Sequence, residues 1–211
     1  MKKPCPSKRV VHEKEEKVME KNVTGTGPAV KILGIVGSLR KGSFNKALMR
    51  LALELVPEGT QLEVFDLEGM PLFNQDLEAQ PPERIKEFKA KIRAADAILI
   101  ATPEYNYSIP GVLKNAIDCV SRPYGDNALD GKPAALMGAS VGMLGTARAQ
   151  YHLRQSFVFL NMFPINRPEV MVAFADKKVD QNGNLTDETT RKLVKQLLEN
   201  LVAWTKKLRE A

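Results

Sequence analysis

The chain has 211 residues, of which 44% are hydrophobic and 27% are charged, so it is long enough and apolar enough to form one globular domain. Its net charge of +6 favours anionic small molecules. Half of that charge lies in residues 1–21, where basic residues are mixed with acidic ones and are not interleaved with aromatics, so nucleic-acid binding is only weakly supported. No apolar run approaches the roughly 18 residues that would indicate a membrane-spanning helix.

The residue pattern in the first part of the chain predicts a polar extension, followed by alternating strands and helices. Residues 1–29 are charged and punctuated by proline and glycine, so we expect a mostly flexible extension, with one helical turn over 13–21 as the alternative. Apolar residues predict a strand over 30–37, and helical spacing of leucines predicts a helix over 44–55. Alternating polarity predicts an edge strand over 61–66.

The middle of the chain continues this alternation. A loop rich in proline and acids over 67–82 leads into a predicted amphipathic helix over 83–94. Residues 97–101 are wholly apolar, as expected of a strand buried on both faces of a sheet. A helix over 111–121 and a fourth strand over 133–140 follow.

The last part predicts a helix over 145–161, a fifth strand over 169–174 and a closing helix over 187–208. Strands that alternate with helices indicate βαβ units and a parallel sheet. Right-handed crossovers between five strands favour an α/β fold of flavodoxin-like type, a three-layer sandwich with a five-stranded parallel sheet of order 2-1-3-4-5. We therefore expect one flavodoxin-like domain over 30–211, behind the N-terminal extension.

A loop suited to an anion follows the first predicted strand. Residues 37–45 read Gly-Ser-Leu-Arg-Lys-Gly-Ser-Phe-Asn, and a helix is predicted to begin at their end. Helix N-termini present unpaired N–H groups and a partial positive charge, and the serine, asparagine and arginine side chains add donors for a phosphate. An ATP-type loop is disfavoured because Ser43 and Phe44 stand where its lysine and hydroxyl residue belong. An ordinary turn with a serine cap remains the alternative.

Two more unusual loops are predicted to meet the first one. In a sheet of this order the ligand lies beyond the carboxyl ends of the strands, between the first and third strands. Residues 102–111 follow the third strand and are rich in tyrosine and asparagine, which suit a flat heteroaromatic ring. Residues 140–145 follow the fourth strand and hold glycines where a close ligand would exclude side chains. Turn-anchoring aromatics and a plain helix-start turn are the alternatives.

These three segments together resemble the NAD(P)H-dependent FMN reductase family, and most closely its chromate and quinone reductase branch. The likeness rests on residues 37–45, on Pro-Glu-Tyr-Asn-Tyr-Ser-Ile-Pro-Gly and its continuation over 103–118, and on Ser-x-Gly-x-x-Gly over 140–145. It implies that the first segment binds the FMN phosphate region, while the other two line and close on the isoalloxazine ring. The implied FMN-binding residues are Ser38, Leu39, Arg40, Lys41, Gly42, Ser43, Phe44, Asn45, Pro103, Glu104, Tyr105, Asn106, Ser140, Gly142 and Gly145.

The resemblance implies an FMN-dependent oxidoreductase. NADPH or NADH would pass hydride to the flavin, and quinones, chromate or similar acceptors would take the electrons from the same face in a ping-pong cycle. The flavin carries the hydride, so no side chain is expected to act as a catalytic acid, base or nucleophile, and no metal is expected. The alternative is a flavodoxin-like electron carrier, or an FMN-binding regulatory module without turnover. Such proteins and a reductase need the same FMN-binding residues.

The family also implies a homodimer or homotetramer. Arg148 and Tyr151 are three residues apart on the helix predicted over 145–161, so they share a face. We expect this face to contact another subunit, with Glu169 as a candidate partner. A solvated helix face is the alternative.

Cysteine usage and the N-terminus favour a cytoplasmic location. Cys5 and Cys119 are too few and too isolated for a disulfide framework, which points to a reducing compartment. His12 and His152 make no recognisable zinc site. The first residues lack the apolar stretch of a secretory signal. Neither a membrane nor a nucleic acid is expected as a partner.

Overall fold

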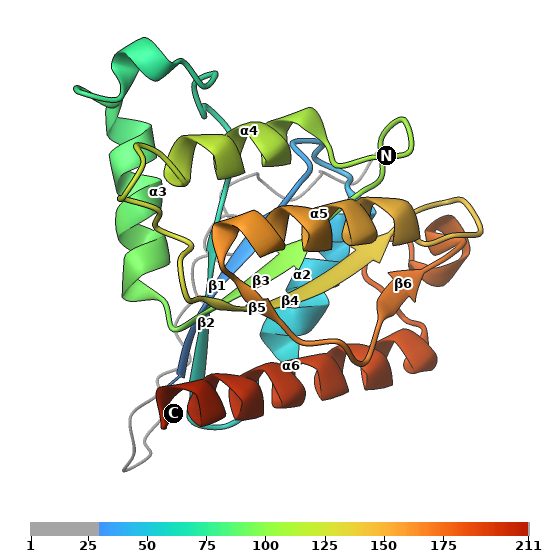
Figure 1. Ribbon diagram of the computed structural model, residues 1–211. Helices are drawn as coiled ribbons and strands as arrows, with labels where there is room; N and C mark the ends of the chain where they lie inside the picture. The colour runs from blue at the N-terminus through green and yellow to red at the C-terminus, as the bar shows by residue number, and fades with distance from the viewer. Residues whose placement is uncertain (1–29, 211) are drawn as a thin grey trace, which may run out of the picture.

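The computed structural model describes residues 30–210, and six strands in that range form one parallel sheet (Figure 1). The strands lie in the order β2-β1-β3-β4-β5, and β6 also pairs with β4. Their bounds are β1 (Val30–Val36), β2 (Thr60–Phe65), β3 (Ala97–Ala101), β4 (Pro133–Ala139), β5 (Phe163–Pro164) and β6 (Val170–Val172).

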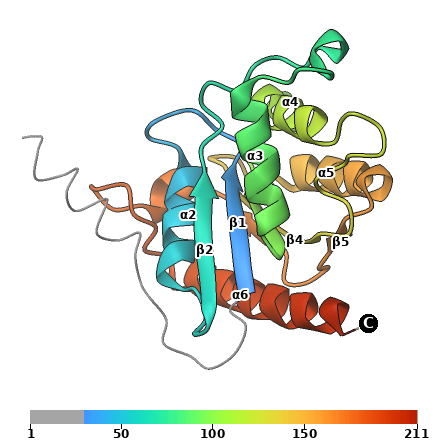
Figure 2. The same cartoon turned by 90° about the vertical axis from the view of Figure 1, so that its left-hand side faces the viewer.

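Helices cover both faces of this sheet. Figure 2 shows β2 and β1 between α2 on one side and α3 on the other. One face packs against α2 (Phe44–Glu54) and α6 (Glu188–Arg209), and the other packs against α3 (Glu83–Ala94), α4 (Gly111–Val120) and α5 (Ala147–Leu160). Two short 3-10 helices, η1 (Gln75–Leu77) and η2 (Ala175–Lys178), lie in connections. Within residues 30–210, no helix has the length and apolarity to cross a bilayer.

The central strands are apolar along their whole length because helices cover them on both sides. Every residue of β3 and of β4 is buried. On one face, Leu48 of α2 and Leu197 of α6 belong to the core, and on the other face Phe88 of α3 and Phe157 of α5 do. Since β1, β3 and β4 are parallel neighbours, their carboxyl ends lie at the same edge of the sheet.

The predicted strand order and the alternation of strands and helices are confirmed. The fifth strand differs, because two short segments share its position: β5 pairs with the start of β4 and β6 with its end. The strand predicted over 169–174 ends at Val172 because Phe174 takes a left-handed φ of 51°. The N–H of Phe174 donates to the carbonyl of Gly142 rather than to a strand. The helical turn considered over 13–21 lies outside the described residues.

Candidate functional site

Three loops follow the carboxyl ends of β1, β3 and β4 and lie together at one edge of the sheet (Figure 1). They are named here loop 1 (residues 37–43), loop 3 (residues 102–110) and loop 4 (residues 140–146). The N–H of Gly37 donates to the carbonyl of Ala101 at 2.9 Å, which joins loop 1 to the end of β3. The three segments that the sequence predicted to converge are therefore neighbours.

Loop 1 contains a run of backbone donors, unpaired within the described residues, just before the start of α2. The N–H groups of residues 38–42 donate to no acceptor among residues 30–210. Ser38, at the start of this run, is 3% exposed. Arg40 is exposed, forms no ion pair with a carboxylate of residues 30–210, and holds its guanidinium carbon 5.3 Å from the centre of the Phe44 ring. A phosphate here would meet backbone donors, a cation and the helix dipole together.

The last part of the predicted phosphate segment faces the protein interior. Ser43 caps α2, since its Oγ accepts the N–H of Asn45 at 3.2 Å. Both polar atoms of the Asn45 side-chain amide bind the backbone of Ala139. Nδ2 donates to the Ala139 carbonyl, and Oδ1 accepts the Ala139 N–H, each at 2.9 Å. These bonds tie the start of α2 to the end of β4. Asn45 therefore sets loop 1 beside loop 4, and its side-chain amide is occupied within the chain.

Loop 3 contains a tight turn that displays aromatic side chains. Tyr105 and Ser108 exchange both backbone hydrogen bonds, at 3.1 and 3.0 Å. Between them Asn106 and Tyr107 have φ values of 49° and 67°, as a type I′ turn requires. Pro103 is buried at the start of the loop, whereas Tyr105 and Asn106 are exposed. The turn leaves Tyr105 at the surface of the site with its backbone direction fixed.

The carboxylate of Glu104 is committed to α5. Its Oε2 accepts the backbone N–H groups of Arg148 at 3.1 Å and of Ala149 at 3.4 Å, and its Oε1 accepts the Nε of Arg148 at 2.5 Å. The hydrogen bond with Glu104 raises the pKa of Arg148 above its ordinary value. The side-chain oxygens of Glu104 are therefore occupied within the chain, which leaves its backbone groups for any ligand. Sequence reasoning missed this pair because its members are 44 residues apart.

Loop 4 leaves apolar side chains in solvent beside the other two loops. Val141, Met143 and Leu144 are exposed, Met143 by 74%. The carbonyls of Ser140 and Gly142 accept N–H groups from the segment after β6, which fixes the loop from behind. This exposed apolar surface is the kind that marks a ligand or partner.

The two predicted glycines of loop 4 serve different purposes. At Gly142 a Cβ would have open space, since its nearest neighbour is the Oγ of Ser140 at 3.8 Å. At Gly145 φ is 52°, and a Cβ would overlap the backbone of Met171. Chain packing therefore requires glycine at 145, whereas at 142 the space is open to a ligand.

The three loops fit a ligand that has a phosphate at one end and a flat, partly apolar plate at the other. Loop 1 supplies the donors and the cation for a phosphate, and Tyr105 with the apolar tip of loop 4 supplies a surface for a ring. FMN has this shape and charge. The fit rests on the unpaired donors of residues 38–42 within the described chain and on the open space at Gly142.

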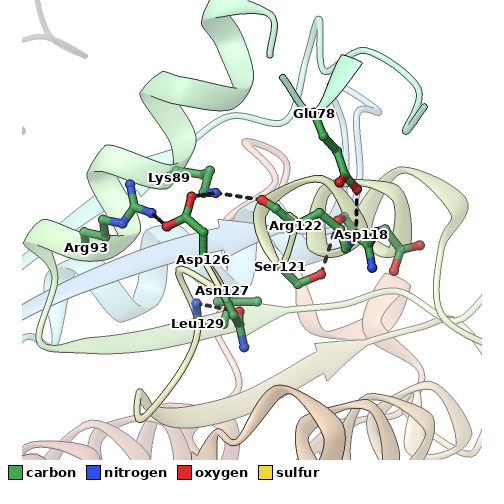
Figure 3. Close-up of polar contacts among 9 residues, drawn as sticks. All are labelled: Glu78, Lys89, Arg93, Asp118, Ser121, Arg122, Asp126, Asn127 and Leu129. Atoms are coloured by element: carbon green, nitrogen blue, oxygen red, sulfur yellow. Dashed lines mark hydrogen bonds and ion pairs between the residues drawn. The ribbon is translucent and has the colours of Figure 1, made fainter. Parts of the chain in front are cut away.

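A cavity of about 260 Å³ lies outside these loops, between η1, α3 and the segment that follows α4. Figure 3 shows Lys89, Arg93 and Arg122 of its lining beside the protein's own carboxylates. Lys89 Nζ donates to the carbonyl of Arg122 and to Asp126, Arg93 also pairs with Asp126, and Arg122 Nε donates to Glu78. The Lys89 hydrogen bond lowers the pKa of Asp126. These ion pairs fasten the segment after α4 to α3 and η1.

Comparison with known proteins places this chain in a family. The family model for NADPH-dependent FMN reductase matches residues 30–177, a range that contains all three loops. An NAD(P)H-dependent FMN reductase of Pseudomonas aeruginosa is 52% identical over 181 residues, which is 85% of this chain and 97% of that protein. A 2-hydroxy-1,4-benzoquinone reductase of a Burkholderia species is 44% identical over 84% of this chain and 97% of its own length.

The likeness extends to a plant enzyme and to a solved structure. An NADPH:quinone oxidoreductase of Arabidopsis thaliana is 44% identical over 88% of this chain and 97% of its own length. The structure of FerB, a flavoenzyme NAD(P)H:(acceptor) oxidoreductase from Paracoccus denitrificans, superposes with a TM-score of 0.78 at 36% identity. It covers 85% of this chain and 98% of the other. The chain therefore belongs to the NADPH-dependent FMN reductase family.

Proposed function

We propose that this protein binds FMN and uses it to transfer electrons from NADPH or NADH to quinones. The observation that carries the proposal is the run of backbone N–H groups at residues 38–42, which lack acceptors within residues 30–210 and lie beside Arg40 at the start of a helix. Relatives named as FMN reductases and quinone reductases, at 44–52% identity, support the same activity.

In this proposal each loop has its own task. Loop 1 holds the phosphate through its N–H groups, Ser38 and Arg40, while Leu39, Lys41, Gly42 and Phe44 shape its surface. Loop 3 borders the ring with the backbone of Pro103, Glu104 and Asn106 and the side chain of Tyr105. Loop 4 closes over the ring from Ser140, with Gly142 leaving room. Bound FMN supplies the redox chemistry by accepting a hydride equivalent and releasing electrons to an acceptor.

The open apolar rim between Tyr105 and loop 4 is the proposed landing surface for both substrates. A nicotinamide and a quinone are flat, so each can lie against such a surface in turn. This shared surface predicts ping-pong kinetics, with parallel lines in double-reciprocal plots when NADPH and quinone are varied together. Chromate is a further proposed acceptor, because it is an anion and the net charge of +6 attracts anions.

The outer face of α5 is the proposed contact between subunits in a homodimer or homotetramer. Val158 and Phe159 are 83% and 79% exposed on this helix, which is unusual for large apolar side chains. Tyr151 donates to Glu169 of the same chain at 2.9 Å, and Arg148 pairs with Glu104. These predicted interface residues thus have partners within their own chain, and the exposed apolar pair is the stronger support for the contact.

The proposal also covers the organisation of the chain and its location. It places the reductase domain over residues 30–211, in the cytoplasm; the extension expected over residues 1–29 lies outside the described residues. The chain has only two cysteines, which suits a reducing compartment.

The direct experiment is to purify the full chain and follow the colour of its flavin. We expect a yellow protein with one FMN per chain, which NADPH or NADH bleaches without oxygen and benzoquinone restores. A colourless protein that folds but takes up no added FMN would refute the proposal. A yellow protein that neither nicotinamide nucleotide bleaches would instead establish the electron carrier or regulatory module.

A further inference from the structure

The carboxylate of Glu104 acts as the N-terminal cap of α5. The residue at the cap position, Thr146, has a φ of 75° and no side-chain cap hydrogen bond. Glu104 supplies the missing acceptor from loop 3, because its Oε2 lies 3.1 Å from the N–H of Arg148 and 3.4 Å from that of Ala149. A carboxylate at this end of a helix also interacts favourably with the helix dipole.

Arg148 closes a second connection between α5 and loop 3. Its guanidinium pairs with Glu104, whose side chain is 8% exposed, and its guanidinium carbon lies 3.5 Å from the centre of the Tyr107 ring. Tyr107 is one of the two central residues of the type I′ turn and has a φ of 67°, which costs energy for a residue with a side chain. The stacked guanidinium helps to hold the turn in that conformation.

A third contact lies one turn further along α5. The Oγ of Ser108 and the Nδ1 of His152 are 2.9 Å apart, so the residue that ends the turn is also attached to α5. Glu104, Tyr107 and Ser108 therefore bring both sides of the tight turn onto one helix. Asn106 and the exposed Tyr105 lie between these attachments.

We propose that Glu104 and Arg148 form a latch that positions loop 3 for the flavin ring, and that Glu104 is a positioning residue rather than a flavin ligand. The latch holds the backbone of residues 104–106 in the turn conformation in the absence of FMN. The entropy of ordering that segment is therefore lost on folding and does not weaken FMN binding. This inference rests on the proposed function for the ring, but the latch itself is a property of the protein without flavin.

Two single variants and their combination test the latch. Glu104→Gln keeps the shape of the side chain and removes its charge, while Arg148→Met keeps much of the stem and leaves Glu104 able to cap α5. We expect each single variant to raise the FMN dissociation constant about tenfold, measured by quenching of flavin fluorescence. The double variant should bind no more weakly than the worse single variant, because both changes break the same unit.

The flavin spectrum and hydrogen exchange give readouts that do not depend on turnover. We expect the visible absorption bands of bound FMN to shift in both variants, because the backbone beside the ring is no longer fixed. In the FMN-free protein, the amides of residues 104–108 should exchange faster than in the unaltered chain. Glu54→Gln is the matched control, since Glu54 pairs with Arg191 at 3.3 Å in an exposed position between α2 and α6.

The possible results distinguish failure of the latch proposal from failure of the proposed function. Unchanged FMN affinity and spectrum in both single variants would overturn the proposal, and so would faster exchange without any change in FMN affinity. An effect of equal size in Glu54→Gln would also overturn it. If the unaltered chain failed to bind FMN, the proposed function would fall, while the exchange measurement would still decide whether the latch exists.

Discussion

The side-chain amide of Asn45 binds both backbone groups of Ala139, a residue 94 positions away in the chain. Both hydrogen bonds are 2.9 Å long and both residues are buried. One residue at the start of α2 thereby fixes the end of β4, from which loop 4 departs. This contact joins the start of α2, which follows loop 1, to the residue from which loop 4 departs.

Asn45→Ala is expected to destabilise the protein by about 2–4 kcal/mol, because it leaves a buried N–H and a buried carbonyl of Ala139 without partners. Urea unfolding of the flavin-free chain measures this. Asn200→Ala is the control: it removes one exposed hydrogen bond to the carbonyl of Arg167 and should cost about 1 kcal/mol or less. Equal losses of unfolding free energy in the two variants would contradict a larger contribution from the buried Asn45 contact.

Arg40→Ala is expected to raise the dissociation constant for FMN by about 10- to 100-fold, the usual size of a charge-assisted contact of about 1.5–3 kcal/mol. Riboflavin lacks the phosphate, so its affinity should stay the same in this variant. Isothermal titration with both flavins makes the comparison. Lys195→Ala on α6 serves as the control for a general loss of positive charge. Equal weakening of FMN and riboflavin would place Arg40 away from the phosphate.

Gly142→Ala and Gly145→Ala should separate ligand space from chain packing. Gly145→Ala forces a Cβ into the backbone of Met171 at a φ of 52°, so we expect a loss above about 2 kcal/mol in urea unfolding. Gly142→Ala meets open space and should change stability by less than about 0.5 kcal/mol. It should weaken FMN binding instead. Normal FMN affinity in Gly142→Ala would remove Gly142 from the site.

Replacing both Val158 and Phe159 by glutamate should reduce the size of the assembly. The two side chains are largely exposed in the single chain, so charges there cost little to the fold but are unfavourable in an apolar contact between subunits. Sedimentation velocity compares the variant with the unaltered protein. A mass unchanged by the double substitution would place the subunit contact elsewhere. This pair is a cleaner test than Arg148, whose substitution also frees Glu104.

Asp187 gives the fold a defined dependence on pH. It caps α6, with Oδ2 accepting the Thr190 N–H at 2.8 Å and the Thr190 hydroxyl at 2.6 Å, and these bonds lower its pKa. A carboxyl with a lowered folded-state pKa stabilises the protein above its unfolded pKa of about 3.9, and this contribution is lost as the pH falls through the folded-state value.

Asp187→Ala should therefore lower the free energy of unfolding by about 1 kcal/mol at neutral pH. The difference between the unaltered chain and Asp187→Ala should shrink as the pH is lowered from about 5 toward 3 in urea unfolding series. Asp187→Asn keeps an acceptor for the cap but cannot titrate, so its stability should lack this contribution to the pH dependence. A difference that stays constant with pH would contradict the assignment.

The order of the sheet and the three loops of the site were predictable because they depend on local patterns. Apolar runs such as 97–101 mark strands that helices cover on both faces, and βαβ connections allow few arrangements. The position of loop 1 between β1 and α2 was also predictable, because it depends on residues that are adjacent in the chain. The divided fifth strand was not predictable, because pairing of Phe163 and of Val170 with different parts of β4 is decided between strands far apart in sequence.

By itself the sequence determined the fold, the family and the segments that meet at the carboxyl edge of the sheet, since these follow from periodicity and from motifs that are contiguous in the chain. The tertiary structure alone decided what each side chain in those segments does. Asn45 and Glu104 have the chemistry of ligands, but their hydrogen-bonding groups are satisfied by Ala139 and Arg148. A polar side chain can bind a ligand only with groups that the fold leaves unpaired, and pairing across 44 or 94 residues exists only once the chain has folded.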